Sequence, residues 1–246
     1  MSARSKDYHR ELERLQDQIV ACRKCTRLIR YCRQVAREKR RMFRQWEYWG
    51  RPLPSFGDPE AELLIVGLAP AAHGGNRTGR MFTGDRSGDF LYRALYEAGF
   101  ASQPVSRSRD DGLRLKNCYI TASLRCAPPK NRPRPEELAN CQPYLLRELA
   151  LLRRVRAVLA LGKTAFDTYL RTVWRPEVFP PRSQFKFSHG GSFALPDGLP
   201  RLFASYHPSQ QNTQTGKLTP GMMRSVLEDI RRYFAQCAGA RSKAEP

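Results

Sequence analysis

The chain has 246 residues, and its 43 Lys plus Arg against 23 Asp plus Glu give a formal net charge of +20. Such a charge attracts polyanions and predicts salt-sensitive binding to nucleic acid, although a merely basic protein has the same composition. Hydrophobic residues make up 41% of the chain, which excludes global disorder, and no apolar run reaches the ~20 residues of a membrane span. The first 15 residues lack the apolar stretch of a secretory signal, so we expect a cytoplasmic, nucleoid-associated protein without a membrane partner.

The positive charge is spread along the chain rather than confined to one tail. Residues 1–60 have a net charge of +7, residues 61–150 of +4 and residues 151–246 of +9. Arg outnumbers Lys by 34 to 9, and the planar guanidinium group suits bidentate bonds to phosphate. We therefore expect more than one segment to contact a polyanion.

The first 60 residues are predicted to be mainly helical. Residues 6–20 place Leu12, Leu15 and Ile19 at helical spacing, and the basic, aromatic residues 31–50 are also expected to form a helix. The turn-rich sequence RPLPSFGDP then connects this region to the rest of the chain.

Four short apolar runs after this region predict buried parallel strands, at residues 62–68, 117–123, 155–162 and 200–206. Helical patterns alternate with them at residues 88–99, 135–152 and 163–171, and a last helix begins at Pro220 behind the N-cap Thr219. This alternation is typical of an α/β sandwich around a parallel sheet. We expect a single domain over residues 1–246, with a loose tail from about residue 239.

Three loops rich in Gly, Pro, Asn, Thr and His follow the predicted strands. They are GLAPAAHGGNRTGRMFTGD after the first strand, LRCAPPKNRPRPEE after the second and HPSQQNTQTGKLTP after the fourth. Ligand sites of open α/β sheets form beyond the carboxyl ends of the strands. The three loops are therefore predicted to converge on one site.

Seven cysteines in a chain without a secretory signal indicate thiols or metal ligands rather than disulfides. Cys22 and Cys25 form a Cys-x-x-Cys pair, and Cys126 is followed by Cys141 after fourteen residues. Four thiolates suit either a tetrahedral zinc ion or a cubane iron–sulfur cluster, and the spacing does not choose between them. A redox Cys-x-x-Cys is the alternative, but that motif belongs at a strand-to-helix turn. The other cysteines are interpreted as ordinary core or surface residues: Cys32, Cys118 and Cys237.

The sequence Gly162-Lys163-Thr164 repeats the end of a phosphate-binding loop. That loop needs an earlier glycine, and Ala157 of an apolar strand occupies the required position. We therefore interpret the motif as a strand turning into a helix, and exclude an ATPase.

Four further side chains in the loops have types that carry chemistry. His207 directly follows the fourth strand, where it can donate a hydrogen bond to an anion that develops on a substrate. Asp85 can orient water, cap the following helix or do both, whereas Asp89 fits the helix start better. Phe82 offers a flat face for a base or fills the core, and His73 contacts substrate or holds its loop in shape.

The paired loops GLAPAAHGGNRTGRMFTGDRSGDFL and HPSQQNTQTGKLT resemble the family 5 (UdgB-type) branch of the uracil-DNA glycosylase superfamily. The resemblance covers roughly residues 20–237. It implies a three-layer α/β/α sandwich with a central four-stranded parallel sheet, and excision of damaged bases from DNA. It also implies a structural 4Fe-4S cluster on Cys22, Cys25, Cys126 and Cys141, which joins the N-terminal segment (about residues 1–60) to the domain.

The same resemblance assigns roles by position. Asp85 and Asn131 match residues that handle the hydrolytic water, and His207 matches the histidine that stabilises the leaving base. Leu68 stands where other families carry a polar water activator. The remaining implied contacts with the flipped base come from the first loop and from the loop after the fourth strand: Gly67, Leu68, Ala69, Pro70, Ala71, His73, Phe82 and Ser209.

The sequence also bears on specificity and on competing functions. Ala122 and Ser123 stand where stricter relatives carry an asparagine that reads uracil, so tolerance of other altered bases is expected. Only Lys130 and Lys217 are available as amines in the loops, which predicts a monofunctional enzyme without strand cleavage. We also expect a monomer that acts on double- and single-stranded DNA containing damaged bases. The wedge that fills the vacated base stack is sought in residues 209–218, with Leu218 as a candidate. The alternative function is a non-catalytic nucleic-acid-binding protein with a four-cysteine metal or iron–sulfur site.

Overall fold

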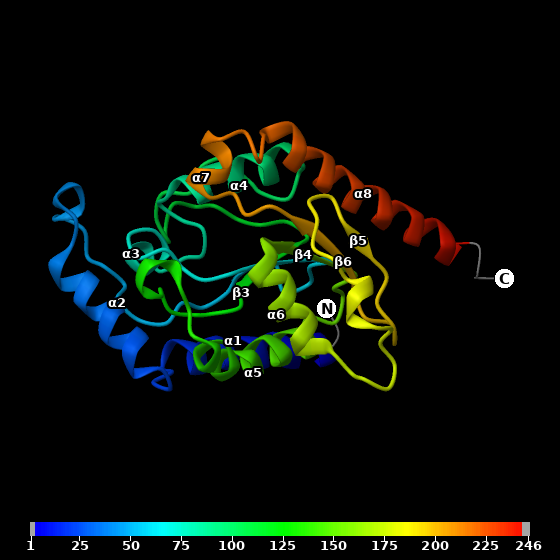
Figure 1. The fold of residues 1–246 in the computed structure, drawn as a ribbon, viewed down its shortest axis with the longest axis horizontal. Helices are drawn as coiled ribbons and strands as arrows, with labels where there is room; N and C mark the ends of the chain where they lie inside the picture. Colours follow the sequence, from blue (N-terminus) through cyan, green and yellow to red (C-terminus); the bar gives the residue numbers. More distant parts are fainter. Residues whose placement is uncertain (1–2, 243–246) are drawn as a thin grey trace.

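The computed structural model describes residues 3–242, which form a six-stranded sheet with helices on both faces (Figure 1). Its centre is parallel, in the order β3-β2-β4-β6. These strands are β2 (Leu63–Gly67), β3 (Cys118–Ala122), β4 (Ala157–Leu161) and β6 (Arg201–Ser205). The four predicted strands and their parallel pairing are confirmed.

Two short antiparallel strands extend the edges of this sheet. β1 (Phe56–Gly57) pairs with β3, and β5 (Ser192–Phe193) pairs with β6. Hydrophobic periodicity did not predict them, because two residues are too few to show an alternating pattern.

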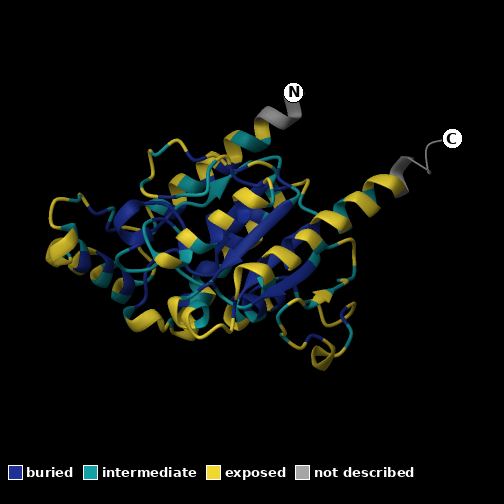
Figure 2. Cartoon of the chain, turned by 90° about the horizontal axis from the view of Figure 1, so that it is seen from above, coloured by how far each residue is buried: buried dark blue, intermediate teal, exposed yellow. Residues whose placement is uncertain are grey.

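Helices cover the two faces and complete the three-layer sandwich. The helices α4 (Arg86–Glu97) and α8 (Pro220–Ser242) lie on one face, and α1 (Ala3–Val20), α5 (Pro135–Leu151) and α6 (Lys163–Val173) lie on the other (Figure 1). In β2, Leu63 and Ile65 belong to the core under α4 and α8, while Leu64 and Val66 belong to the core on the opposite face. Figure 2 shows the buried strands between partly exposed helices.

The predicted helix at residues 31–50 is wrong beyond residue 38. Helix α2 (Thr26–Glu38) starts earlier and ends where Lys39 adopts a φ of 48°. A single 3-10 turn, η1 (Arg41–Phe43), and irregular chain follow. The cause is tertiary packing, because the aromatic side chains of this stretch lie against Arg77 and do not continue the apolar face of α2.

Shorter elements connect the layers: α3 (Gly75–Thr78), η2 (Pro129–Asn131), η3 (Arg182–Gln184) and α7 (Gln210–Gln214). At the C-terminus, α8 stays helical to Ser242, and the rest of the expected loose tail lies outside the described residues.

A buried polar network attaches the N-terminal segment to the sheet. Gln16 of α1 donates to Glu148 Oε1 at 3.0 Å and accepts the Ser55 N–H at 2.7 Å. Glu148 also pairs with Arg125, and both side chains are almost fully buried. A buried carboxylate needs such compensation for its lost hydration. The network therefore fixes the strand end from which the loop with Cys126 departs.

Candidate active site and cysteine cluster

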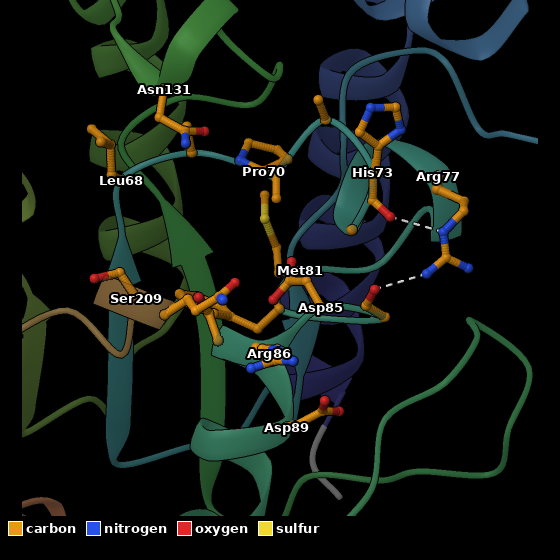
Figure 3. Close-up of a pocket in the computed structure, with 18 of the residues that line it drawn as sticks. Leu68, Pro70, His73, Arg77, Met81, Asp85, Arg86, Asp89, Asn131 and Ser209 are labelled. Carbon is orange, nitrogen blue, oxygen red and sulfur yellow. Dashed lines mark hydrogen bonds between the residues drawn. The ribbon is translucent and has the colours of Figure 1, made fainter. Parts of the chain in front are cut away.

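A cavity of about 1180 Å³ opens at the carboxyl ends of the central strands (Figure 3). All three predicted loops reach it, so their predicted convergence is confirmed. Most of the predicted site residues line it: Leu68, Ala69, Pro70, Ala71, His73, Phe82, Asp85, Asn131, His207 and Ser209. Gly67 is not part of the lining but lies directly beneath the ring of Phe82.

Phe82 forms an aromatic wall of this pocket. Its backbone has a φ of 51°, and its ring lies so close to Gly67 that a Cβ there would stand 2.8 Å from Cζ. The ring centroid is 5.9 Å from that of His207, with the planes tilted by 32°. A Cβ on Gly88 would lie 1.8 Å from the Phe82 carbonyl oxygen. The absence of a side chain at Gly67 and Gly88 therefore provides the room that Phe82 needs in this position.

Asp85 combines a structural contact with a position in the pocket. It is the N-cap of α4, and its Oδ1 accepts the Gly88 N–H at 2.9 Å. The capping role offered for Asp85 is thus confirmed, and Asp89 stands at the helix start as expected, in the first turn of α4. Burial raises the pKa of the Asp85 carboxyl, with the Gly88 N–H acting in the opposite direction. The carboxyl crowds Gly74, where a Cβ would lie 1.9 Å from Oδ2.

His207 follows β6 and is held by its backbone. Its carbonyl accepts the Asn212 Nδ2–H at 2.8 Å, and Ser209 caps the short helix α7 that supplies Asn212. Burial lowers the pKa of the imidazole to about 4. The side chain is therefore neutral at physiological pH, and one of its ring nitrogens carries a hydrogen that can be donated.

Asn131 and His73 lie in different parts of the pocket. Asn131 ends η2, is exposed and adopts a φ of 55°; Figure 3 shows it beside Leu68, away from His73 and Arg77. His73 Nδ1 is 3.1 Å from the Tyr48 hydroxyl oxygen. Burial lowers the pKa of His73, and the nearby Arg40 and Arg77 act in the same direction. His73 thus links its loop to the N-terminal segment.

Sequence reasoning missed a second group of pocket residues. Arg77 is almost fully buried, and its guanidinium group donates to the carbonyls of His73 at 2.8 Å and Gly84 at 2.7 Å. The other missed residues come mainly from the N-terminal segment and the rims of the loops: Arg40, Met42, Phe43, Trp46, Arg86, Arg107 and Lys130. The basic and aromatic run RRMFRQW could have indicated these residues of the N-terminal segment. It was instead interpreted as part of a helix over residues 31–50.

The structure also places the residues expected to affect base specificity, Ala122 and Ser123, and the wedge candidate Leu218. Ala122 lines the pocket, while Ser123 is buried and its Oγ has no hydrogen-bond partner among the described residues. Leu218 is completely buried in the core beneath α8. It is therefore wrong as a wedge residue, because a wedge must be free to enter DNA.

The four predicted ligand cysteines come together from distant parts of the sequence. Cys22 and Cys25 precede α2, with Cys25 at its N-cap, while Cys126 follows β3 and Cys141 lies within α5. Burial raises the pKa of Cys141 to about 11, and the neighbouring Cys25 and Cys22 thiols act in the same direction. Asn140 Nδ2 donates to Cys25 Sγ at 3.6 Å.

Cys32 adds a fifth thiol to this group. It is buried against Cys126 and donates to the Ala127 carbonyl at 3.7 Å, in an apolar cluster that includes Leu28 and Leu124. Within residues 3–242, no three His, Cys, Asp or Glu side chains are arranged to hold a single metal ion. Four converging thiols with an amide donor nearby nevertheless fit a larger thiolate-bound group.

No helix in the described part of the chain is long and apolar enough to cross a membrane.

Comparison with known proteins defines the class. A family profile described as the "Uracil DNA glycosylase superfamily" matches residues 54–231, and the chain belongs to this superfamily. It is similar to a protein named "Type-5 uracil-DNA glycosylase" from Thermus thermophilus, with 50% identity over 87% of this chain and 94% of that protein. Proteins of the same name from Mycobacterium leprae and Pyrobaculum aerophilum are 49% and 46% identical, over 89% and 86% of this chain and 93% and 88% of theirs.

Proposed function

We propose that the chain is a DNA repair glycosylase of the type-5 kind. It extrudes uracil, or another deaminated or altered base, from DNA and hydrolyses the N-glycosidic bond to leave an abasic site. The observation that carries this proposal is the combination, in one pocket, of the Phe82 face, a neutral His207 and an Asp85 carboxyl of raised pKa. A non-catalytic nucleic-acid-binding protein would have no need of this arrangement.

The reaction begins with a base in the pocket. Extrusion costs roughly a few kcal/mol and is easiest for a mispaired base. The base lies against Phe82, whose ring faces the same space as the His207 ring. As the glycosidic bond lengthens, positive charge develops on the sugar and negative charge on the departing base.

His207 stabilises the departing base as a neutral hydrogen-bond donor. Because its pKa is low, the imidazole is neutral at physiological pH. It donates one N–H to the oxygen of the base on which negative charge accumulates. Burial increases the strength of this bond because little water competes for it.

Asp85 acts on the other side of the bond that breaks. Its carboxylate attracts the positive sugar and accepts a hydrogen bond from the water that captures it, and a raised pKa favours uptake of the water's proton. Asn131 reaches the pocket from the loop after β3 and orients the same water. Leu68 has no polar atom for this purpose, so these two side chains supply the polar contacts.

The shape of the pocket supports broad base tolerance. Ala122 presents a methyl group at the end of β3, where an asparagine would form paired hydrogen bonds with one particular base. A site without a matched donor and acceptor rejects alternative bases less strongly. Lys130 is exposed at the rim and is not required as a nucleophile, so the enzyme is monofunctional.

The cofactor we propose is a 4Fe-4S cluster held by Cys22, Cys25, Cys126 and Cys141. Such a group supplies a multivalent cross-link between segments that are far apart in sequence, and it takes no part in the reaction. Arg125 supports the site through its backbone N–H, which donates to Cys141, and through its positive charge. Cys32 then remains a thiol beside the ligand set.

We further propose that the protein is a cytoplasmic, nucleoid-associated monomer that accepts double- and single-stranded DNA. The test is a base-excision panel with duplex and single-stranded oligonucleotides that carry uracil, hypoxanthine, xanthine or a mismatched thymine. Abasic sites are expected with uracil and with at least one other base, and borohydride should trap no covalent adduct. Absence of abasic sites with every substrate would leave only the binding function.

A further inference from the structure

The outer wall of the pocket is formed by residues 39–47, here called the arm. It leaves the end of α2 and projects at the left of Figure 1, and four of its residues line the pocket: Arg40, Met42, Phe43 and Trp46. It thus belongs to the N-terminal segment yet borders the space where a base would be held.

The arm is fixed to the loop that carries Asp85. The Arg77 guanidinium carbon lies 3.8 Å from the ring centroid of Phe43 and 4.1 Å from that of Trp46. The same guanidinium group donates to the carbonyls of His73 and Gly84. Because a cation held between aromatic faces and carbonyls has little freedom, the arm has a defined position relative to the pocket.

The tip of the arm is apolar and unusually exposed. Met42 is 74% exposed, more than Tyr96, Leu146 or Val178, the other large hydrophobic side chains that are exposed in the described structure. The neighbouring Arg40, Arg41 and Arg44 side chains are exposed as well. An apolar tip surrounded by cations is the arrangement that proteins insert between base steps while the cations contact phosphates.

We propose that Met42 enters the DNA duplex and fills the stack that an extruded base vacates, while the surrounding arginines hold the flanking phosphates. This inference rests on the proposed glycosylase function, and it assigns the wedge to the arm, since Leu218 of the loop after β6 is buried. Met42 suits the role because an unbranched thioether adapts to irregular apolar gaps. Filling the gap slows return of the base into the stack.

The test compares excision of uracil from a duplex and from the same strand alone. In single-turnover assays at saturating enzyme, Met42→Ala should lower the duplex rate by about tenfold, which corresponds to roughly 1.4 kcal/mol. The single-strand rate should change by less than about twofold, because single-stranded DNA has no stack to fill. Met42→Leu should restore most of the duplex rate.

The control is Leu146→Ala on α5, which removes an exposed apolar side chain outside the pocket lining and should leave both rates unchanged. Fluorescence of 2-aminopurine placed next to uracil should rise when wild-type enzyme binds, and Met42→Ala should lower that rise. Unchanged duplex rates in Met42→Ala, or equal losses on duplex and single strand, would overturn the wedge. Absence of excision by the wild-type enzyme would instead contradict the glycosylase function.

Discussion

The two walls of the pocket use charge in opposite ways. The inner wall, the loop of residues 67–89, holds a half-buried Asp85 and a buried Arg77, and loss of hydration raises the pKa of the first and lowers that of the second. The outer wall, the arm, exposes Arg40, Arg41 and Arg44. A buried charge acts on a fixed neighbour with little screening, whereas an exposed charge attracts at long range and is screened by salt. We therefore expect that charges on the inner wall act mainly on the reaction and that arginines on the outer wall act mainly on DNA binding, so that their substitutions have different kinetic consequences.

The largest effect is expected on the inner wall, for Asp85→Asn. Loss of a general base typically lowers rates by about 10²–10⁴-fold, and we expect a loss in this range for single-turnover excision. Asparagine is as good an N-cap as aspartate, so the helix contact with Gly88 should persist and the Tm should not fall. Thermal unfolding measured beside excision separates the reaction role of Asp85 from its capping role.

The pH profile sharpens this prediction. Asp85 acts in its ionised form, so activity should fall when the pH drops below its pKa. Because that pKa is raised, the fall should begin at a higher pH than for an ordinary aspartate. His207 has a pKa of about 4 and stays neutral through most of that range, so it does not cause the decline. Asp110→Asn, at an exposed carboxylate outside the pocket lining, is the control and should keep the profile. An unchanged profile in Asp85→Asn would show that another group titrates.

The next largest effect is expected for His207→Ala. Removal of one donor to a developing anion costs about 100–1000-fold in rate, and uracil excision should fall by that factor. Affinity for DNA with an abasic site should change little, because no departing base is present. His9→Ala on α1, which removes a histidine outside the pocket lining, is the control and should retain the rate. A loss of less than about tenfold in His207→Ala would move the stabilisation of the base to another group.

Cys126→Ser tests whether the outer wall depends on the cysteine cluster. Cross-links between distant segments contribute roughly 2–5 kcal/mol, so loss of the proposed cluster should lower the Tm by about 10 °C and lower activity with it. Iron content, visible absorbance and thermal unfolding measure the three effects. Cys237→Ser on α8 and Cys32→Ser should both keep iron. Full stability after loss of iron would contradict a scaffold role, and loss of iron in Cys32→Ser would place the fifth thiol among the ligands.

The two walls also differed in how far the sequence predicted them. The parallel strands and the convergence of Asp85, Asn131 and His207 were predictable, because apolar runs mark buried strands and parallel strands share one carboxyl edge. The gathering of Cys22 and Cys25 with Cys126 and Cys141 was implied by the resemblance, whereas the Cys-x-x-Cys spacing indicated only that Cys22 and Cys25 lie together.

The arm could not be predicted, because its shape depends on contacts across the fold. The basic and aromatic composition of residues 39–47 is compatible with an amphipathic helix. The rings of Phe43 and Trp46 instead pack on Arg77, which is some thirty positions away in sequence. The neutral state of His207 and the raised pKa of Asp85 likewise arise from burial by several segments. Local pattern carries no information on such burial.

Arg41→Gln in the arm is expected to have the smallest effect on the excision rate and the clearest effect on affinity for duplex DNA. Each phosphate contact that is lost should reduce the slope of log K against log salt by about 0.9, and affinity for duplex DNA should fall most at low salt. Arg154→Gln is the matched control, because this exposed arginine precedes the amino end of β4, whereas the pocket lies at the carboxyl ends of the strands. Single-turnover excision at saturating Arg41→Gln should stay within about twofold of wild type, since phosphate contacts position the duplex without touching the reacting atoms. An equal fall in saturated rate and in affinity would mean that Arg41 acts on the reaction itself and does not only hold a phosphate.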